Sequence, residues 1–506
     1  MEQRFTIYYT SDTHGHVFPV NYAAARSEAS GLLNMAARIE KDGDTLVLDG
    51  GDSLQGTPLV QYYLEHRSGW PTHPVAAAFN ALGLDYYTLG NHDFNFGYEA
   101  LEEFLRAMRG RCLCANVQDL GGRLPLAPWA VHTLANGLRV GITGVVTDYV
   151  NVWEQPENLE KLRVTDAFAA ARAACEALAP LCDVRVCIYH GGFEEELGTG
   201  RMLSASGENA ACRIARQLDF DLLLTGHQHM AVEGQALAGT WVAQPPANAG
   251  VCLRVQGSRQ GRHTRFSSRF VPAGQLHPAH PFESLLPLER AVQRWLDEPI
   301  GALERPIPPE GKLEAALGGS RVAALFNQVQ LDATGADVSC TSLGNDPVGL
   351  ASPVTMRGVT AAYLFANTLV TLEVTEAVIR RCLERCAAYF ELQNGQPQVS
   401  AGFLQPKVEH YNYDFFAGLD YAFDLRRPVG QRVVRLTRLD GSPLGPGPLR
   451  LCTSNYRATG TGGYEVLRDC PVLWRGSVEL PDMVARYIRE HSPVAEPCNA
   501  RFQVIW

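Results

Sequence analysis

The chain has 506 residues, of which 46% are hydrophobic and 19% are charged, and its formal net charge is -10. This length exceeds what one hydrophobic core commonly supports, so we expect two domains. The composition is that of a globular protein, and the acidic balance argues against a protein that coats a nucleic acid polymer. No apolar run approaches the roughly 20 residues of a membrane-spanning helix. We therefore expect neither a nucleic acid polymer nor a membrane as a partner.

The amino terminus, Met-Glu-Gln-Arg-Phe-Thr-Ile, enters a strand pattern at once and contains no apolar signal core. The 13 cysteines are odd in number and scattered along the chain, which is typical of reduced thiols. These features favour a cytoplasmic protein. The alternative, if the sequence lacks an amino-terminal segment, is a periplasmic or secreted protein.

Short apolar runs alternate with polar turns and helical patterns from residue 5 to about residue 257. This alternation predicts an α/β layer structure, in which ligands bind beyond the carboxyl ends of the strands. Five of the apolar runs end in clusters of polar residues. These clusters lie at residues 11–14, 49–52, 90–92, 190–192 and 225–229.

A proline-rich region between residues 266 and 280 interrupts this pattern, and residues 282–296 then show apolar side chains at helical spacing. Helical patterns, short strands and Gly/Pro-rich turns follow, which is typical of an α+β domain. The predicted parts of the chain are a first domain at 1–278, a linker helix at 279–299 and a second domain at 300–506.

The five polar clusters contain the side chains that could hold two metal ions. Asp12 and His14 stand two residues apart after a strand, and Asp52 has two oxygens that could bridge ions about 3.5–4 Å apart. Asn91 offers a neutral oxygen, and the remaining ligands are imidazoles. These imidazoles belong to His190, His227 and His229. Mixed nitrogen and oxygen ligands suit zinc, manganese or a similar ion better than calcium.

Each cluster also has a simpler interpretation. The Asp12–His14 fragment could be an ordinary turn, Asp52 could cap a helix, and the turn around His227 could lie on the surface. However, the five clusters occur in one chain and each follows a strand. This combination favours a dinuclear metal site.

The fragments Asp12-x-His14, Gly51-Asp52, Gly90-Asn91-His92, His190 and Gly226-His227-x-His229 together resemble the metallophosphoesterase superfamily. The resemblance covers the first domain and implies a four-layer α/β/β/α fold with two divalent metal ions. It implies that one ion is held by Asp12, His14, Asp52 and His229, and the other by Asp52, Asn91, His190 and His227. It also implies that His92 is a catalytic histidine that is not a ligand and acts on the leaving group, while the metals activate a water for in-line attack.

Two stretches of the second domain place tyrosines beside glycines, at residues 410–418 and 454–464. Tyr413 and Tyr456 could each stack on a nucleobase, for about 1–3 kcal/mol per base, or they could be core or turn aromatics. Arg457 could contact phosphate or base, or it could be a solvated charge.

The domain order and these stretches resemble the 5′-nucleotidase family, and most nearly its branch of 2′,3′-cyclic-nucleotide 2′-phosphodiesterase/3′-nucleotidases. The resemblance covers nearly the whole chain. It implies that Tyr413 and Tyr456 hold the base between them. It further implies that the second domain delivers the nucleotide to the metals.

Two departures from the 5′-nucleotidase pattern favour the cyclic phosphodiesterase branch. Asn95 stands where 5′-nucleotidases carry an aspartate that pairs with the catalytic histidine, and an amide stabilises an imidazolium less than a carboxylate does. Residues 341–347 lack the arginine of the family's Gly-Gly-Ile-Arg stretch, and residues 458–463 lack the acidic residue expected to grip the ribose hydroxyls. A missing ribose clamp is consistent with a ribose that itself carries the scissile phosphate.

The sequence therefore predicts a metal-dependent hydrolase of nucleotide catabolism that acts on 2′,3′-cyclic nucleotides and 3′-nucleotides. The alternative within the family is a 5′-nucleotidase or UDP-sugar hydrolase. A more remote alternative is a non-catalytic nucleotide-binding protein. That alternative would lack a ligand or the catalytic histidine, and neither is missing here.

Overall fold

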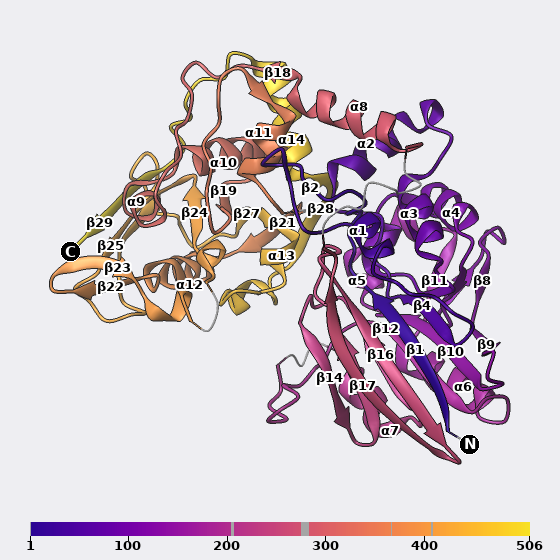
Figure 1. The fold of residues 1–506 in the computed structure, drawn as a ribbon. Coiled ribbons are helices and arrows are strands. Elements are labelled where there is room, and N and C mark those ends of the chain that lie inside the picture. The colour runs from indigo at the N-terminus through magenta and orange to yellow at the C-terminus, as the bar shows by residue number, and fades with distance from the viewer. Residues whose placement is uncertain (1, 204–206, 275–282, 366, 406–407) are drawn as a thin grey trace. The chain divides into compact units, whose positions relative to one another are not determined.

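The structure is a computed structural model, and it divides into two compact units, Met1–Gln293 and Arg294–Trp506 (Figure 1). It describes residues 2–203, 207–274, 283–365, 367–405 and 408–506. The division falls within helix α8 (Leu286–Asp297). Part of the linker helix expected at 279–299 lies outside the described residues, and α8 is the helix found in the remainder.

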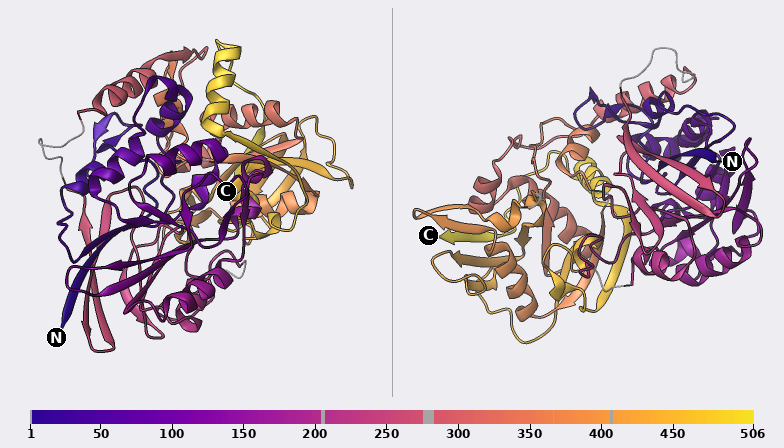
Figure 2. Two further views of the ribbon diagram at one scale, coloured as in Figure 1. Left: turned by 90° about the vertical axis from the view of Figure 1, so that its right-hand side faces the viewer. Right: turned by 60° about the horizontal axis from the view of Figure 1, so that its bottom comes forward.

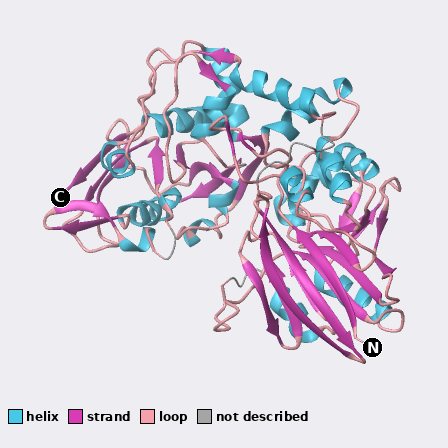
Figure 3. Cartoon of the chain, viewed as in Figure 1, coloured by secondary structure: helices cyan, strands magenta, loops and turns pink. Residues whose placement is uncertain are grey.

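Unit 1 is built around two sheets (Figure 3). The seven-stranded sheet has the order β17 (His263–Pro272), β16 (Val251–Gln260), β1 (Gln3–Thr10), β4 (Thr45–Asp49), β5 (Tyr86–Tyr87), β6 (Arg111–Leu113), β8 (Leu126–Ala127). The six-stranded sheet has the order β14 (Val232–Leu237), β15 (Thr240–Gln244), β13 (Leu222–Thr225), β12 (Val184–His190), β10 (Arg139–Val146), β9 (Trp129–Thr133). The strands β1, β4, β5 and β6 are parallel to one another, as are β10, β12, β13 and β15.

The two sheets of unit 1 pack face to face. Ile7 and Leu48 from the first sheet share a buried cluster with Ile142 and Ile188 from the second. The opposite face of the second sheet, which includes Tyr189, packs against helices α6 (Ala167–Leu178) and α7 (Ala211–Gln217). On the outer side of the first sheet, Phe104 of α4 (Gly97–Ala107) contacts Tyr87 of β5, with ring centroids 6.1 Å apart. The layers are therefore α/β/β/α, as the sequence predicted (Figure 2).

Short helices and ladders complete unit 1. The helices are α1 (Leu32–Ala36), α2 (Pro58–His66), α3 (Pro74–Leu82), α4 (Gly97–Ala107), α5 (Val150–Trp153), α6 (Ala167–Leu178) and α7 (Ala211–Gln217), with 3-10 turns η1 (Arg67–Gly69), η2 (Asn91–Phe94) and η3 (Pro156–Leu159). The two-stranded ladders are β2 (Val20–Asn21) with β3 (Arg26–Ser27), and β7 (Val117–Asp119) with β11 (Leu162–Val164).

Unit 2 contains a mixed five-stranded sheet with helices on both faces. Its order is β24 (Asp414–Ala417), β19 (Val338–Ser342), β27 (Leu449–Ser454), β21 (Thr368–Val374), β28 (Val472–Glu479). A three-stranded sheet pairs β26 (Val433–Arg438), β25 (Leu419–Asp424) and β29 (Arg501–Ile505), and two ladders join β18 (Pro299–Gly301) to β20 (Val354–Thr355) and β22 (Phe390–Gln393) to β23 (Gln396–Val399). The helices are α9 (Lys312–Gly318), α10 (Arg321–Thr334), α11 (Met356–Ala362), α12 (Glu376–Ala387), α13 (Asn455–Ala458) and α14 (Leu480–His491), with η4 (Ala401–Phe403), η5 (His410–Asn412) and η6 (Glu465–Leu467).

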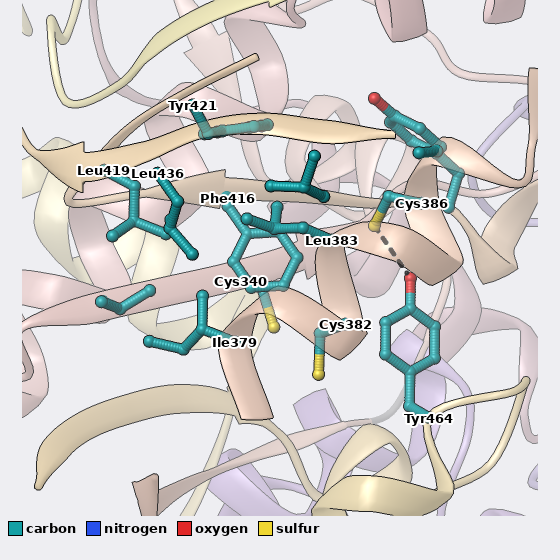
Figure 4. Packing of buried hydrophobic residues seen from close by; sticks show 14 of the residues in the cluster. Cys340, Ile379, Cys382, Leu383, Cys386, Phe416, Leu419, Tyr421, Leu436 and Tyr464 are labelled. Atoms are coloured by element: carbon teal, nitrogen blue, oxygen red, sulfur yellow. Dashed lines mark hydrogen bonds between the residues drawn. The ribbon is translucent and has the colours of Figure 1, made fainter. Parts of the chain in front are cut away.

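Helix α12 shows how the sequence builds one face of this unit. Thr375 caps its first turn by accepting from the Val378 N–H, which satisfies a donor that has no partner within the helix. Ile379, Leu383 and Cys386 recur at helical spacing and pack under the sheet (Figure 4). On the other face, α10, α11 and α14 pack around Phe326. Unit 2 is thus the α+β domain that the sequence predicted.

Among the described residues, no helix combines the length and apolar character needed to cross a bilayer.

Candidate functional site

The predicted metal ligands follow the ends of five strands of unit 1. Asp12 and His14 follow β1, Asp52 follows β4, and Asn91 opens the η2 turn after β5. These strands belong to the seven-stranded sheet. The other ligands come from the six-stranded sheet, because His190 ends β12 and the His227 turn follows β13. Each sheet therefore supplies part of one site.

The loops that carry these ligands have an unusual backbone. Five of the ligand residues have left-handed φ angles, namely Asp12 (53°), His14 (47°), Asp52 (57°), His227 (71°) and His229 (55°). Non-glycine residues adopt such angles rarely and at a cost of order 1–3 kcal/mol each. The surrounding hydrogen bonds hold these turns in place; for example, Asp12 Oδ1 accepts from the His227 N–H at 2.8 Å.

The first group of possible ligands consists of Asp12, His14 and His229, whose ligand atoms all lie within 4.8 Å of one another. His14 Nδ1 lies 2.9 Å from the Gln55 carbonyl oxygen, to which it donates. This bond leaves the lone pair of His14 Nε2 facing His229 Nε2, 3.0 Å away. Two imidazole nitrogens at this distance need a proton or a cation between them.

The second group consists of Asp52, His190 and His227, and Asn91 lies beside it. His190 Nδ1 donates to the Gly50 carbonyl oxygen at 2.6 Å, and its Nε2 lies 3.2 Å from both Asp52 Oδ2 and Asn91 Oδ1. His227 Nδ1 lies 2.8 Å from the same Asn91 oxygen. Four lone-pair-bearing atoms thus converge on one point, which is the donor set of a cation site.

The charges around this point favour additional positive charge. Although burial opposes the charged form of His190, Asp52 and Asp12 raise its pKa to about 10. Burial likewise opposes the charge on Asp52, but His190 and His92 hold its pKa well below the usual range. The negative charge of the buried carboxylates favours a proton on the neighbouring imidazole. The same negative charge would favour a divalent ion in place of that proton. Calcineurin-like phosphoesterases bind divalent metals, and the residues present here fit two such ions.

His92 lies next to the ligand groups but belongs to neither. Its backbone N–H donates to Asp52 Oδ1 at 2.7 Å, and its ring centroid is 5.6 Å from that of His14. Burial lowers its pKa. Its Nδ1 lies 3.1 Å from the Asn95 amide, so the structure brings both of the predicted catalytic residues together at the metal groups.

The structure corrects the expectation for Tyr413. This side chain is only 3% exposed, and its hydroxyl donates to the Ala316 carbonyl oxygen at 3.1 Å. Its ring packs edge-on against Phe415 and Phe390 in the core of unit 2. Tyr413 lies between η5 and β24, where its ring is buried in the core, and no face of the ring is open to a base.

Arg457 is also buried rather than solvated or open to a ligand. It is 2% exposed and forms a paired ion bridge to Asp414, with Nε–Oδ2 and Nη2–Oδ1 distances of 2.8 Å each. Its guanidinium stacks over the Tyr464 ring at 4.1 Å. The ion pair and the stacking hold residues 454–464 against residues 411–414. In this structure the Arg457 guanidinium is therefore not available to contact a phosphate or a base.

Tyr456 is the predicted substrate residue that is accessible, with 39% exposure. The sequence analysis missed Tyr411, which is partly buried in η5 and whose carbonyl oxygen accepts from Arg457 Nη2 at 3.0 Å. The Arg457 guanidinium also lies 5.6 Å from the Tyr456 ring centroid. Arg457 therefore links the two segments that carry Tyr411 and Tyr456.

Comparisons with known proteins agree with this architecture. The calcineurin-like phosphoesterase model matches residues 5–231, and the 5′-nucleotidase C-terminal domain model matches residues 299–469. A solved structure of a Staphylococcus aureus protein described as a putative 5′-nucleotidase is 30% identical over 100% of both chains, with a TM-score of 0.84. The chain belongs to the 5′-nucleotidase family of metallophosphoesterases.

Curated relatives in this family are more distant. The 2′,3′-cyclic-nucleotide 2′-phosphodiesterase/3′-nucleotidase of Haemophilus influenzae is 24% identical and covers 98% of this chain and 86% of its own length. The trifunctional nucleotide phosphoesterase YfkN of Bacillus subtilis is 25% identical over 96% of this chain, which spans only 38% of YfkN. The members of this family are nucleotide phosphoesterases or nucleotidases, so this chain is a phosphoric ester hydrolase.

The comparisons also correct the expected cytoplasmic location. The relatives contradict it: a Thermus thermophilus structure with 23% identity, 99% coverage of both chains and a TM-score of 0.62 is described as a 5′-nucleotidase precursor. A precursor is made with a segment that is later removed. The first residues seen in this sequence therefore do not support a cytoplasmic assignment.

Three other residues of unit 1 contact the predicted site residues and were not found from the sequence. The Glu208 carboxylate lies 2.8 Å from His227 Nε2, the Trp153 ring stacks on His227 at 5.3 Å, and Glu154 lies 2.8 Å from the Asn95 amide nitrogen. They come from segments that do not follow a strand directly, so no local pattern marks them. Only the tertiary fold brings them to the metal ligands.

Proposed function

We propose that this chain hydrolyses 2′,3′-cyclic nucleotides and 3′-nucleotides at a two-metal site in unit 1. The observation that carries the proposal is the convergence of two ligand groups, Asp12/His14/His229 and Asp52/His190/His227, with His92 beside them. Two divalent ions, when bound, supply Lewis-acid activation of the attacking water and neutralise charge on the phosphoryl oxygens.

The chain's own residues orient and protonate the leaving group. Asp52 fixes the His92 backbone, and Asn95 accepts from its Nδ1, so Nε2 is the atom that can give a proton to the leaving ribose oxygen. An amide partner is consistent with the cyclic phosphodiesterase branch. Three curated relatives with that activity in their names cover 95–98% of this chain at 22–24% identity.

Base recognition is assigned to unit 2. We propose that Tyr456 and Tyr411 offer aromatic faces to the nucleobase, with Tyr411 in place of the buried Tyr413. Each stacking contact would contribute about 1–3 kcal/mol with little base preference. Arg457 would position both segments from behind, through its bonds to Tyr411 and Asp414.

The test compares four substrates with one purified full-length sample in manganese, namely 2′,3′-cyclic AMP, 3′-AMP, 5′-AMP and UDP-glucose. The expected result is that kcat/KM for the first two exceeds that for the others by at least about 10-fold. His92→Ala should retain its metal content and lose about 100-fold or more in kcat, since it removes the proton donor. Full activity of this variant would refute the role of His92.

A second candidate, a 5′-nucleotidase, is favoured by the Staphylococcus aureus structure that matches the whole chain at 30% identity. Dominant turnover of 5′-AMP in the same experiment would select it over the leading proposal.

A further inference from the structure

The Asn95 amide lies among three side chains of unit 1, His92, Gln55 and Glu154, and Gln55 Nε2 is 3.2 Å from its Oδ1. With the amide oriented by its partners, Oδ1 accepts from His92 Nδ1 at 3.1 Å and Nδ2 donates to Glu154 Oε2 at 2.8 Å. The opposite orientation would set the amide oxygen against the carboxylate. The hydrogen-bond partners therefore decide which way the amide points.

Glu154 is itself held firmly. Its Oε1 accepts from the Gln155 N–H at 2.7 Å and from Asn158 Nδ2 at 2.8 Å. Asn158 Nδ2 also donates to the Asn95 carbonyl oxygen at 3.1 Å. The carboxylate, which is partly buried, is thus fixed on one oxygen by its own segment and presents the other oxygen to Asn95.

We propose that Glu154 is a positioning residue that acts on His92 through the Asn95 amide, a role that rests on the function proposed above. The bond to Glu154 prevents the amide from rotating, so that Asn95 Oδ1 stays aimed at His92 Nδ1. The hydrogen is thereby kept on Nδ1, and Nε2 is left to face the reacting phosphate.

The oxygen of the attacking water forms a bond to phosphorus, and the bond between phosphorus and the ribose oxygen breaks. The water releases a proton to solvent, the Nε2 proton passes to the ribose oxygen, and the imidazolium becomes a neutral imidazole. The Nδ1–H remains bonded to Asn95 throughout. Glu154 neither gains nor loses a proton.

This arrangement predicts a dependence on the leaving group. An alkoxide such as a ribose oxygen needs a proton to leave, whereas p-nitrophenolate does not. Glu154→Gln should therefore lower kcat for 3′-AMP about 10- to 100-fold, with KM changed by less than about 2-fold, and lower bis(p-nitrophenyl) phosphate hydrolysis by less than about 3-fold. Glu157→Gln, an exposed carboxylate in the same segment, is the matched control and should leave both rates unchanged.

An exchange of charge makes the test sharper. Asn95→Asp alone sets two carboxylates against each other and should also slow 3′-AMP hydrolysis about 10-fold or more. The double variant N95D/E154Q places the carboxylate directly on His92 and lets the amide introduced at position 154 donate to it. It should recover activity above both single variants, which a purely structural role for Glu154 would not produce.

The outcomes separate this inference from the proposed function. If the wild type hydrolyses no nucleotide, the proposed function fails. If the wild type is active but E154Q loses neither rate, loses both equally, or is not rescued by N95D, the role of Glu154 is overturned. Should E154Q fail to fold, N95D carries the test alone: a loss confined to 3′-AMP supports the relay, and unchanged activity overturns it.

Discussion

Glu208 shows how a single side chain prepares a ligand. Its carboxylate accepts from His227 Nε2, which leaves Nδ1 to face Asn91 and the second ligand group. Partners of this kind fix the ring orientation of a metal-binding histidine and increase its basicity.

Replacing this carboxylate should weaken metal binding without unfolding the unit. Glu208→Gln is expected to lower the affinity for the more weakly held ion about 10- to 100-fold, measured by titrating manganese into chelator-treated protein. Glu176→Gln, an exposed residue on α6, is the control. Equal affinity in both variants would show that Glu208 does not orient His227.

His73 is a residue whose burial predicts a pH effect on stability. It caps α3 by accepting from the Ala76 N–H, and its ring packs against Tyr63 and Phe104. Its Nε2 is buried without a hydrogen-bond partner among the described residues. Burial therefore lowers the pKa of His73 to about 3.

The unfolded chain binds a proton at His73 near pH 6.5, whereas the folded chain does not until about pH 3. The stabilising effect of neutral His73 is therefore complete above pH 6.5 and is lost as the pH falls. Relative to His73→Phe, the wild type should lose about 2 kcal/mol of unfolding free energy between about pH 6.5 and 5. The free energy of unfolding of both proteins is measured by urea unfolding at each pH. The same change with pH in the wild type and in His73→Phe would contradict this expectation.

At the scale of elements, the close approach of the loops after β4 and β5 creates the site. Gly51 has φ +89°, and a Cβ there would lie 2.2 Å from the Gly90 backbone nitrogen. Asp93 joins the same loops from the side by accepting the N–H groups of Asp52, Ser53 and Gly90. A side chain at Gly51 would separate Asp52 from Asn91.

Gly51→Ala should therefore reduce both stability and metal content. The strained φ alone costs about 1–2 kcal/mol, and the backbone clash adds to it. Gly137→Ala is the matched control, because Gly137 has φ +84° and its Cβ would have no neighbour within 4 Å. Gly137→Ala should lower the free energy of unfolding only by the cost of the strained φ angle. Its metal content, measured by elemental analysis, should equal that of the wild type. Metal content in Gly51→Ala equal to that of the control would exclude the clash.

Element boundaries show where local sequence decides. The Thr375 cap and an apolar face both specify helix α12, Glu376–Ala387. The apolar residues before the polar cluster at 90–92 extend to Leu89, but strand β5 is only Tyr86–Tyr87. Residues 88–90 lead instead into the turn that carries Asn91, where Asp93 accepts from the Gly90 N–H of its own loop and from the N–H groups of Asp52 and Ser53 in the loop after β4.

At the scale of the whole molecule, unit 1 holds the ligands and unit 2 holds the proposed base-binding tyrosines. This division predicts that one substitution in unit 2 affects nucleotides selectively. Tyr456→Ala should raise KM for 3′-AMP about 5- to 100-fold, since it removes one stacking contact, and leave bis(p-nitrophenyl) phosphate hydrolysis unchanged. Trp506→Ala, another exposed aromatic of unit 2, is the control.

A loss of activity on both substrates would place Tyr456 in the fold of the site rather than in base binding. Unchanged KM for 3′-AMP would remove Tyr456 from base recognition altogether.

The sequence alone specified the two-domain α/β and α+β architecture and the type of chemistry. It could do so because the metal ligands lie directly after apolar strands, where local pattern and function coincide. The tertiary structure decided what sequence spacing does not encode. The Tyr413 ring was expected to bind a base but is buried in the core of unit 2. The Arg457 guanidinium is paired with the Asp414 carboxylate. Glu154 and Glu208 are brought to the site from segments that are distant in the sequence. Burial and long-range hydrogen bonds exist only once the chain has folded, so these roles could not be read from the residues in order.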